Sequence, residues 1–215
     1  MKNWKGKLIF FALFLVPIIF YVLWKNAEER YHPLEIFGET EMDGTKTPWT
    51  LRDFSLIDQN GDTVGLDDFK DKIIVANFFY ATCPSICPRM NNNLRLAVDK
   101  FQNTEDVVFI SHTVNPAQDT VEALRAYSQR YGYSSDKWKF LTGPKSEIYD
   151  LAQNHYHVVA PRPDGEYDFI HSTTIVLIDK EHRVRGYFES NENPSFYKEL
   201  RDGIHVLLVE YHHKK

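Results

Sequence analysis

Residues 73–88 read IIVANFFYATCPSICP, an apolar run that leads directly into a pair of cysteines. The first eight residues are almost all apolar, β-branched or aromatic, which is typical of a strand buried on both faces of a sheet. Cys83 and Cys87 follow this strand, and beyond Pro88 apolar side chains recur at helical spacing. We therefore predict a central strand, a turn that carries both cysteines, and a helix opened by Pro88.

Further strands and helices extend this unit in both directions. Residues 107–110 form a second buried strand, so that strand, helix and strand make a right-handed βαβ unit with parallel strands. Asn60-Gly61 marks a small β-hairpin before this unit, and Asp119 is predicted to cap a helix that stops at Gly132. The remaining predicted elements are a helix over 144–154, short strands over 156–160, 173–178 and 184–188, and a last helix capped by Asn193 with Pro194 at its first position.

This order of elements, with a cysteine motif where the first central strand meets its helix, is the thioredoxin arrangement. Open α/β sheets bind ligands at the carboxyl ends of their strands, and the cysteines lie there. We predict an α/β, thioredoxin-like fold with an N-terminal β-hairpin extension over residues 49–215.

The N-terminus has the pattern of a membrane anchor. Three lysines precede an uncharged apolar run from Leu8 to Trp24, close to the lower limit of the about 17–25 residues that a spanning helix needs. We predict a single transmembrane helix within residues 1–25 and a juxtamembrane linker over 26–48, with a cleaved signal peptide as the alternative. The positive-inside rule then places the N-terminus in the cytoplasm and the rest outside, which is the periplasmic side of a bacterial inner membrane.

Composition excludes several classes of protein. The 215 residues are 43% hydrophobic and carry a formal net charge of −5, which fits a globular domain and gives no basic footprint for a nucleic acid. Only two cysteines occur, so a disulfide-dense scaffold and a four-cysteine zinc site are excluded.

Cys83 and Cys87 can share a ligand or bond to each other. Two residues four apart on a helix have Cβ atoms about 5–6 Å apart, so both sulfurs reach one metal ion or form a disulfide after a small rearrangement. The start of a helix favours thiolate, which is both the nucleophile and the metal ligand. The alternative is that both cysteines are simply small buried hydrophobic residues.

Two thiolates need a third ligand, and His171 is the candidate. It precedes the strand predicted over 173–178, and in this fold the loop before that strand faces the cysteines. Thiolates with one imidazole suit Cu(I), histidine also supports Cu(II), and zinc is compatible with the ligand types. His155 and His157 flank Tyr156 and are predicted to share one face of a strand in a packing or solvated role.

The chain resembles the Sco/SenC family of membrane-anchored copper proteins, which serve assembly of the dinuclear copper centre of cytochrome c oxidase. The residues that carry the resemblance are Thr82–Pro88, similar to the family's C-x-x-x-C-P, His171 followed by Ser172, and Val114–Thr120, similar to its D-P-x-x-D-T. The resemblance implies that Cys83, Cys87 and His171 bind copper. The implied partners are the copper-bearing oxidase subunit and other copper chaperones or thiol reductants.

Two positions depart from the family pattern. Asn115 stands where the family commonly has Asp, and Ile170 precedes His171 where an acidic residue is frequent, with the nearest carboxylate at Asp168. Residues around metal ligands tune a metal site, so both changes bear on its strength or on the partner surface.

The leading hypothesis is a copper chaperone, which turns over no substrate. The alternative is a membrane-tethered thiol-disulfide oxidoreductase, in which Cys83 attacks a partner disulfide and Cys87 resolves the mixed disulfide. Ordinary enzymes of that class carry C-x-x-C and a cis-proline before the following strand, and this chain has neither feature at those positions. A peroxiredoxin-like peroxidase ranks third, because its peroxidatic motif is absent around the cysteines.

Overall fold

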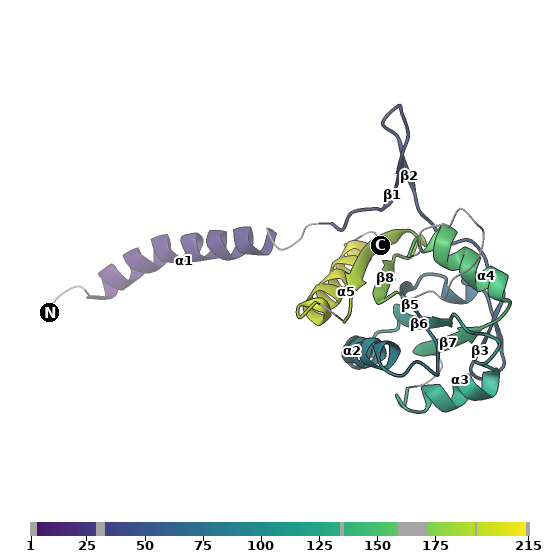
Figure 1. Cartoon of the computed structure of the whole chain (residues 1–215). Coiled ribbons are helices and arrows are strands. Elements are labelled where there is room, and N and C mark those ends of the chain that lie inside the picture. The colour runs from purple at the N-terminus through teal and green to yellow at the C-terminus, as the bar shows by residue number, and fades with distance from the viewer. Residues whose placement is uncertain (1–3, 29–32, 134–135, 159–171, 192, 214–215) are drawn as a thin grey trace. The chain divides into compact units, whose positions relative to one another are not determined.

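The computed structural model describes residues 4–28, 33–133, 136–158, 172–191 and 193–213. The chain divides into two compact units, Met1–Pro33 and Leu34–Lys215 (Figure 1). The first unit contains helix α1, Trp4–Glu28, which includes Pro17. Within the described residues, no helix is both long and apolar enough to cross a membrane. The transmembrane helix predicted within residues 1–25 is therefore not supported by the structure.

The second unit is built on a mixed sheet of seven strands in the order β4-β3-β7-β6-β5-β8-β9. The strands are β3 Leu56–Asp58, β4 Thr63–Val64, β5 Ile73–Phe79, β6 Val107–Thr113, β7 Trp138–Thr142, β8 Thr174–Ile178 and β9 Val184–Glu189. The helices are η1 Leu66–Phe69, α2 Ile86–Phe101, α3 Val121–Ser128, α4 Lys145–Asp150, the π-helix η2 Leu151–His155, and α5 Phe196–His213. A separate two-stranded hairpin, β1 Gly38–Thr40 with β2 Lys46–Pro48, lies within the segment predicted as a linker.

The βαβ unit at the centre of the sheet is as predicted. β5 and β6 pair in parallel over their full lengths, from Ile73 opposite Val107 to Phe79 opposite Thr113, and α2 connects them. The predicted hairpins are also present, as β3 with β4 and β8 with β9. Because β8 runs antiparallel to β5 and β7 runs parallel to β6, the sheet has the thioredoxin-like arrangement that the sequence predicts.

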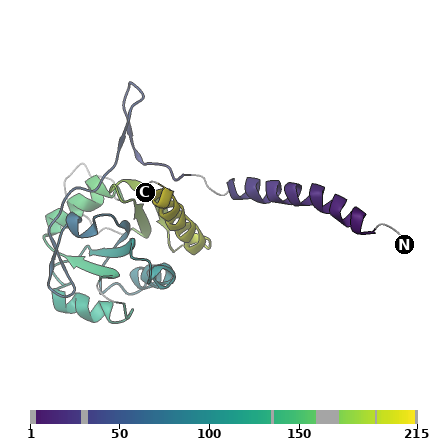
Figure 2. The same cartoon turned by 180° about the vertical axis from the view of Figure 1, so that it is seen from behind.

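Strand alternation divides the core into two layers, one on each face of the sheet. All seven residues of β5 are buried, so the strand serves both layers, as its continuous apolar sequence predicts. Helices α2 and α5 lie side by side and cover one face (Figures 1 and 2). The other face packs against α4, η2, η1 and the segment before β3 that contains Leu51 and Phe54.

A polar network is buried between the sheet and α2. The Ser111 hydroxyl donates to Asn77 Oδ1 over 2.5 Å and accepts from Trp138 Nε1 over 2.9 Å. Asn77 Nδ2 donates to Asn91 Oδ1 over 2.8 Å, and Asn91 Nδ2 donates to the Tyr127 hydroxyl over 3.1 Å. These bonds join β5, β6, β7, α2 and α3, and because the groups are paired the sheet tolerates them in its interior. They fix the rotation of α2, whose first turn carries Cys87.

Several local predictions are wrong. Helix α2 begins at Ile86, so Pro88 is its third residue, a first-turn position where the missing N–H costs no hydrogen bond. Strand β7 was not expected. Residues 156–158 are not a strand, because Tyr156 N–H and Val158 N–H donate back to the carbonyls of Leu151 and Ala152 and continue the turns of η2. The rest of that predicted strand lies outside the described residues.

Candidate functional site

Both cysteines lie at the carboxyl end of the central strand β5. Cys83 is in the loop after β5, where its N–H donates to the carbonyl of Tyr80 over 3.2 Å, and Cys87 is in the first turn of α2. Their exposed fractions are 8% and 6%, and neither is in a disulfide. The residues between them, Pro84, Ser85 and Ile86, are exposed, so the turn itself is presented at the surface.

A hydrogen bond from the backbone of Cys87 joins the two cysteines across the turn. The backbone N–H of Cys87 donates to Cys83 Sγ over 3.3 Å. This donor is one of the N–H groups that the start of an α-helix leaves without a partner inside the helix. It points at the Cys83 sulfur, and a donor in this position stabilises the thiolate form of Cys83.

The environment separates the pKa values of the two thiols. Burial alone would raise the pKa of Cys83, but hydrogen bonds from the backbone N–H groups of Cys87 and Ser85, the Cys87 side chain and the Tyr80 hydroxyl outweigh burial and lower the pKa to about 7. Burial raises the pKa of Cys87 to about 12, and the neighbouring Cys83 and the charge of Asp119 add to the rise. At neutral pH the pair therefore holds its thiolate on Cys83.

Two residues of this environment were not predicted from the sequence. Tyr80 was counted only as the end of the buried strand, although an aromatic residue with a hydroxyl group three positions before a cysteine is a possible donor. Asp119 was predicted to cap a helix, but Thr120 does so, since its hydroxyl accepts from Ala123 N–H over 3.3 Å. Asp119 instead accepts from Ala81 N–H over 3.0 Å, within the loop that leads to Cys83.

The predicted third ligand, His171, lies outside the described residues, as do Asp168 and Ile170. Among the residues that are described, no group of three His, Cys, Asp or Glu side chains is placed to hold a metal ion. Asn115, the other departure from the family pattern, makes local bonds: its N–H donates to Thr113 Oγ1 over 3.0 Å and its side chain donates to Gln118. The structure thus brings together Cys83 and Cys87.

Other histidines have packing roles. His112 is fully buried on β6, and its Nε2 lies 2.9 Å from the Tyr156 hydroxyl. His155 is buried in η2, and His157 stacks on Trp49 with ring centroids 3.9 Å apart. The prediction that His155 and His157 share a strand face is wrong, because η2 occupies the first of these positions. Their packing role is as expected.

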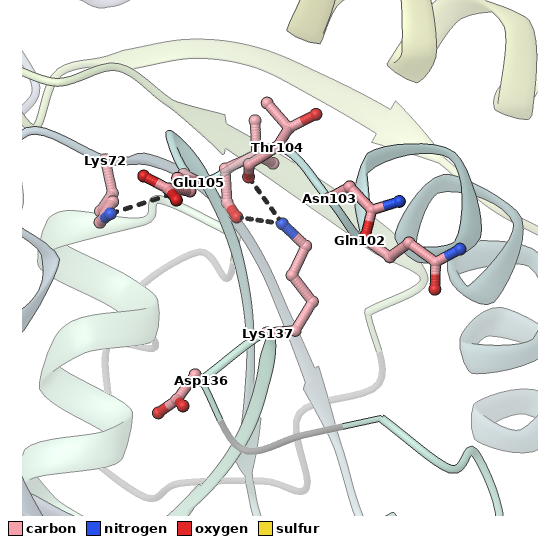
Figure 3. A pocket seen from close by; sticks show the side chains of 8 residues that line it. Lys72, Gln102, Asn103, Thr104, Glu105, Asp136 and Lys137 are labelled. Carbon is pink, nitrogen blue, oxygen red and sulfur yellow. Dashed lines mark hydrogen bonds between the residues drawn. The ribbon is translucent and has the colours of Figure 1, made fainter.

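A cavity of about 450 Å³ lies at the opposite end of β6 (Figure 3). Lys137 Nζ donates there to the carbonyls of Thr104 and Val107 over 2.9 and 2.6 Å, and Lys72 Nζ donates to the Glu105 carbonyl over 3.0 Å. Burial, with the nearby charge of Lys72, lowers the pKa of Lys137 to about 8. The lysines close the turn between α2 and β6, and the cavity is not part of the cysteine site.

Comparisons with known proteins agree on one family. The SCO1/SenC family profile matches residues 42–202. An SCO1 protein homolog of Bacillus subtilis is 29% identical over 150 residues, which cover 69% of this chain and 78% of that protein.

Two solved structures are similar over the globular unit. One is BsSco, a member of the Sco family of cytochrome c oxidase assembly proteins in which a disulfide switch is identified. It is 27% identical with a TM-score of 0.62, covering 74% of this chain and 94% of that chain. The other is Arabidopsis thaliana ScoI with copper bound, 28% identical with a TM-score of 0.60, covering 74% and 98%. The match to most of the globular unit, with the cysteine turn inside it, shows that this chain belongs to the SCO1/SenC family.

Proposed function

We propose that this protein binds one copper ion through Cys83, Cys87 and His171 and delivers it during assembly of the dinuclear copper centre of cytochrome c oxidase. The observation that carries the proposal is the cysteine turn, where two thiols share one hydrogen-bonded site at the start of α2. Membership of the SCO1/SenC family, in which relatives bind copper and assemble the oxidase, supports the same role.

The donor set fits copper. Thiolate is the ligand that Cu(I) prefers, and a single imidazole adds a donor that also suits Cu(II). Cys83 is ready to bind because its hydrogen bonds lower the pKa of the thiol to about 7 and so favour the thiolate. Cys87 has a raised pKa, so binding to both sulfurs releases a proton and weakens as the pH falls.

The partner of this site is the copper-bearing subunit of the oxidase, with other copper chaperones or thiol reductants as further partners. The exposed residues Pro84, Ser85 and Ile86 between the two ligands give such a partner direct access to the turn. Both cysteines are themselves almost buried, so little of either side chain is open to solvent.

Copper binding by ligand variants tests the proposal. The reduced full chain in detergent, kept anaerobic, should bind one copper ion, and either Cys83→Ser or Cys87→Ser should abolish tight binding, because one thiolate cannot replace two. His171→Ala should lower the affinity, and His212→Ala, in the C-terminal helix, is the matched control that should not. Wild-type affinity in either cysteine variant would contradict the shared site.

A thiol-disulfide oxidoreductase is the second candidate, favoured by the low pKa of Cys83 beside the high pKa of Cys87. This chemistry needs the two sulfurs and no histidine. Oxidase activity in cells separates the two functions. If copper delivery is the role, His171→Ala should lower the activity and added copper should restore part of it. If His171→Ala has no effect while Cys83→Ser eliminates activity, the oxidoreductase function is correct.

We further propose that α1 holds the chain at a bacterial membrane, with the globular unit on the periplasmic side. The large apolar side chains of α1 between Phe10 and Val22 are exposed along the helix, and an apolar surface of this size needs a lipid or protein cover. The full chain should sediment with membranes and require detergent for release. Phe10→Glu combined with Phe14→Glu should weaken this association, whereas Lys25→Ala should not. A full chain that stays in the supernatant would contradict the proposal.

A further inference from the structure

Asp119 is a fully buried carboxylate that is hydrogen-bonded to the backbone of the cysteine loop. Its Oδ2 accepts from the N–H of Ala81 over 3.0 Å and from the hydroxyl of Thr113 at the end of β6. Ala81 is only two residues before Cys83, so this carboxylate ties the loop that bears the first cysteine to the end of the neighbouring strand. Asp119 itself is 0% exposed.

The second carboxylate oxygen has no hydrogen-bond partner among the residues that the structure describes. Asp119 Oδ1 is buried, and no described residue donates a hydrogen bond to it. Helix capping does not explain it, because Thr120 caps α3. Both hydrogen bonds that hold the loop are accepted by Oδ2 alone. The side-chain oxygen of a neutral asparagine could accept the same two bonds.

Asp119 also has no counter-charge in the described part of the chain. None of the ion pairs there includes it. Its carboxylate lies against the cysteine loop, because it accepts from the backbone N–H of Ala81, two residues before Cys83. An unpaired buried charge is costly, and a cation bound close to it would repay that cost.

We propose that Asp119 is the electrostatic counter-charge of the copper site and biases the site toward Cu(II) over Cu(I). This inference rests on the proposed copper function. With the same ligands, the Cu(II) form carries one more positive charge than the Cu(I) form, so a fixed negative charge stabilises Cu(II) more. The thiolates alone favour Cu(I), and Asp119 opposes that preference without coordinating the metal.

The variant Asp119→Asn isolates the charge. Its side-chain oxygen can keep both bonds now made by Oδ2. Its amide nitrogen takes the place of Oδ1, which has no bond to any described residue. Thr113→Val is the matched control, because it removes a hydrogen bond to the same carboxylate and leaves the charge. Urea unfolding of all three proteins shows whether each variant remains folded.

The measurement is the reduction potential of the bound copper, recorded by protein voltammetry on the full chain in detergent. Asp119→Asn should lower the ratio of Cu(II) to Cu(I) affinity by about tenfold, which raises the potential by about 59 mV for a one-electron couple. Thr113→Val should leave the ratio within about twofold of wild type, as expected when the charge is kept.

Each outcome decides the matter. Cysteine-dependent copper binding with the expected rise in Asp119→Asn alone supports the inference. Cysteine-dependent binding with an unchanged potential in folded Asp119→Asn overturns it and leaves the proposed function standing. An equal rise in Thr113→Val also overturns it, because loop position rather than charge would then set the potential. A wild-type chain that binds no copper through its cysteines overturns both the inference and the proposed function.

Discussion

Reduced protein should be alkylated at Cys83 far faster than at Cys87 at neutral pH. The two thiols have almost equal exposure, 8% and 6%, so access does not distinguish them. Their pKa values do, at about 7 for Cys83 and about 12 for Cys87. Only the thiolate reacts. The ratio of the two alkylation rates therefore depends on the hydrogen bonds and the burial that set the two pKa values.

The expected preference follows from the two pKa values. At pH 7 about half of Cys83 is thiolate, compared with about one part in 100,000 of Cys87, which favours Cys83 by about 50,000-fold. A thiolate of lower pKa is also less nucleophilic, and a Brønsted coefficient of about 0.4–0.5 over this difference returns a factor of about 100–300. The net preference for Cys83 is about two to three orders of magnitude.

Iodoacetamide labelling under anaerobic conditions, with peptide mass spectrometry, measures the two rates across pH. The Cys83 rate should rise with pH through a midpoint near 7. Tyr80→Phe should move that midpoint upward, because it removes a donor to the thiolate. Cys87→Ser keeps the backbone donor of residue 87, so the Cys83 midpoint should stay below the ordinary cysteine value. Equal labelling of both cysteines at pH 7 would refute the asymmetry.

Three further predictions concern the fold that holds the site, and urea denaturation tests each of them. Phe79→Ala should lower the free energy of unfolding by about 3–5 kcal/mol, because the ring is 1% exposed and belongs to the same core cluster as both cysteines. A loss below about 1 kcal/mol would show that the surrounding side chains move in to fill the cavity. Ser111→Ala should cost about 2–4 kcal/mol, because it leaves Asn77 Oδ1 and Trp138 Nε1 without partners. Burial lowers the pKa of His112 from 6.5 to about 3. Between these two pH values the unfolded chain therefore binds a proton at His112 that the folded chain does not bind. Stability should then fall by up to about 1.4 kcal/mol per pH unit as the pH drops below 6.5. His112→Phe should remove that part of the slope, and an unchanged slope would contradict the assignment.

The centre of the fold could be predicted because its signals are local. The apolar run of β5 and the helical spacing after Cys87 are strong patterns, and they set the βαβ unit. Strand β7 was missed because its five residues, Trp138–Thr142, form a short mixed run whose pairing with β6 depends on distant residues. The strand predicted over 156–160 is wrong for residues 156–158, which continue the turns of η2. The two histidines on either side of Tyr156 suggested the alternation of a strand, but three residues are too few to distinguish a strand from the end of a helix.

The closeness of Cys83 and Cys87 in one turn was predictable from the sequence, and the electrostatics of that turn were not. Cysteine spacing and the position after a central strand identified Cys83 and Cys87. The difference between their pKa values depends on burial, on the Tyr80 hydroxyl and on Asp119, which reaches the turn from a segment after β6. The sequence pattern favoured Asp119 as the cap, and only the packed structure assigns the cap to Thr120 and the loop bond to Asp119.

X-ray absorption spectroscopy of the copper-loaded full chain tests the central claim most directly. With Cu(I) bound to the reduced protein, the first coordination shell should contain two sulfur donors and one nitrogen donor. Cys87→Ser should reduce the sulfur count to one, and His171→Ala should remove the nitrogen contribution while both sulfurs remain. A wild-type shell with a single sulfur, or with nitrogen and oxygen donors only, would contradict a copper site built on Cys83 and Cys87.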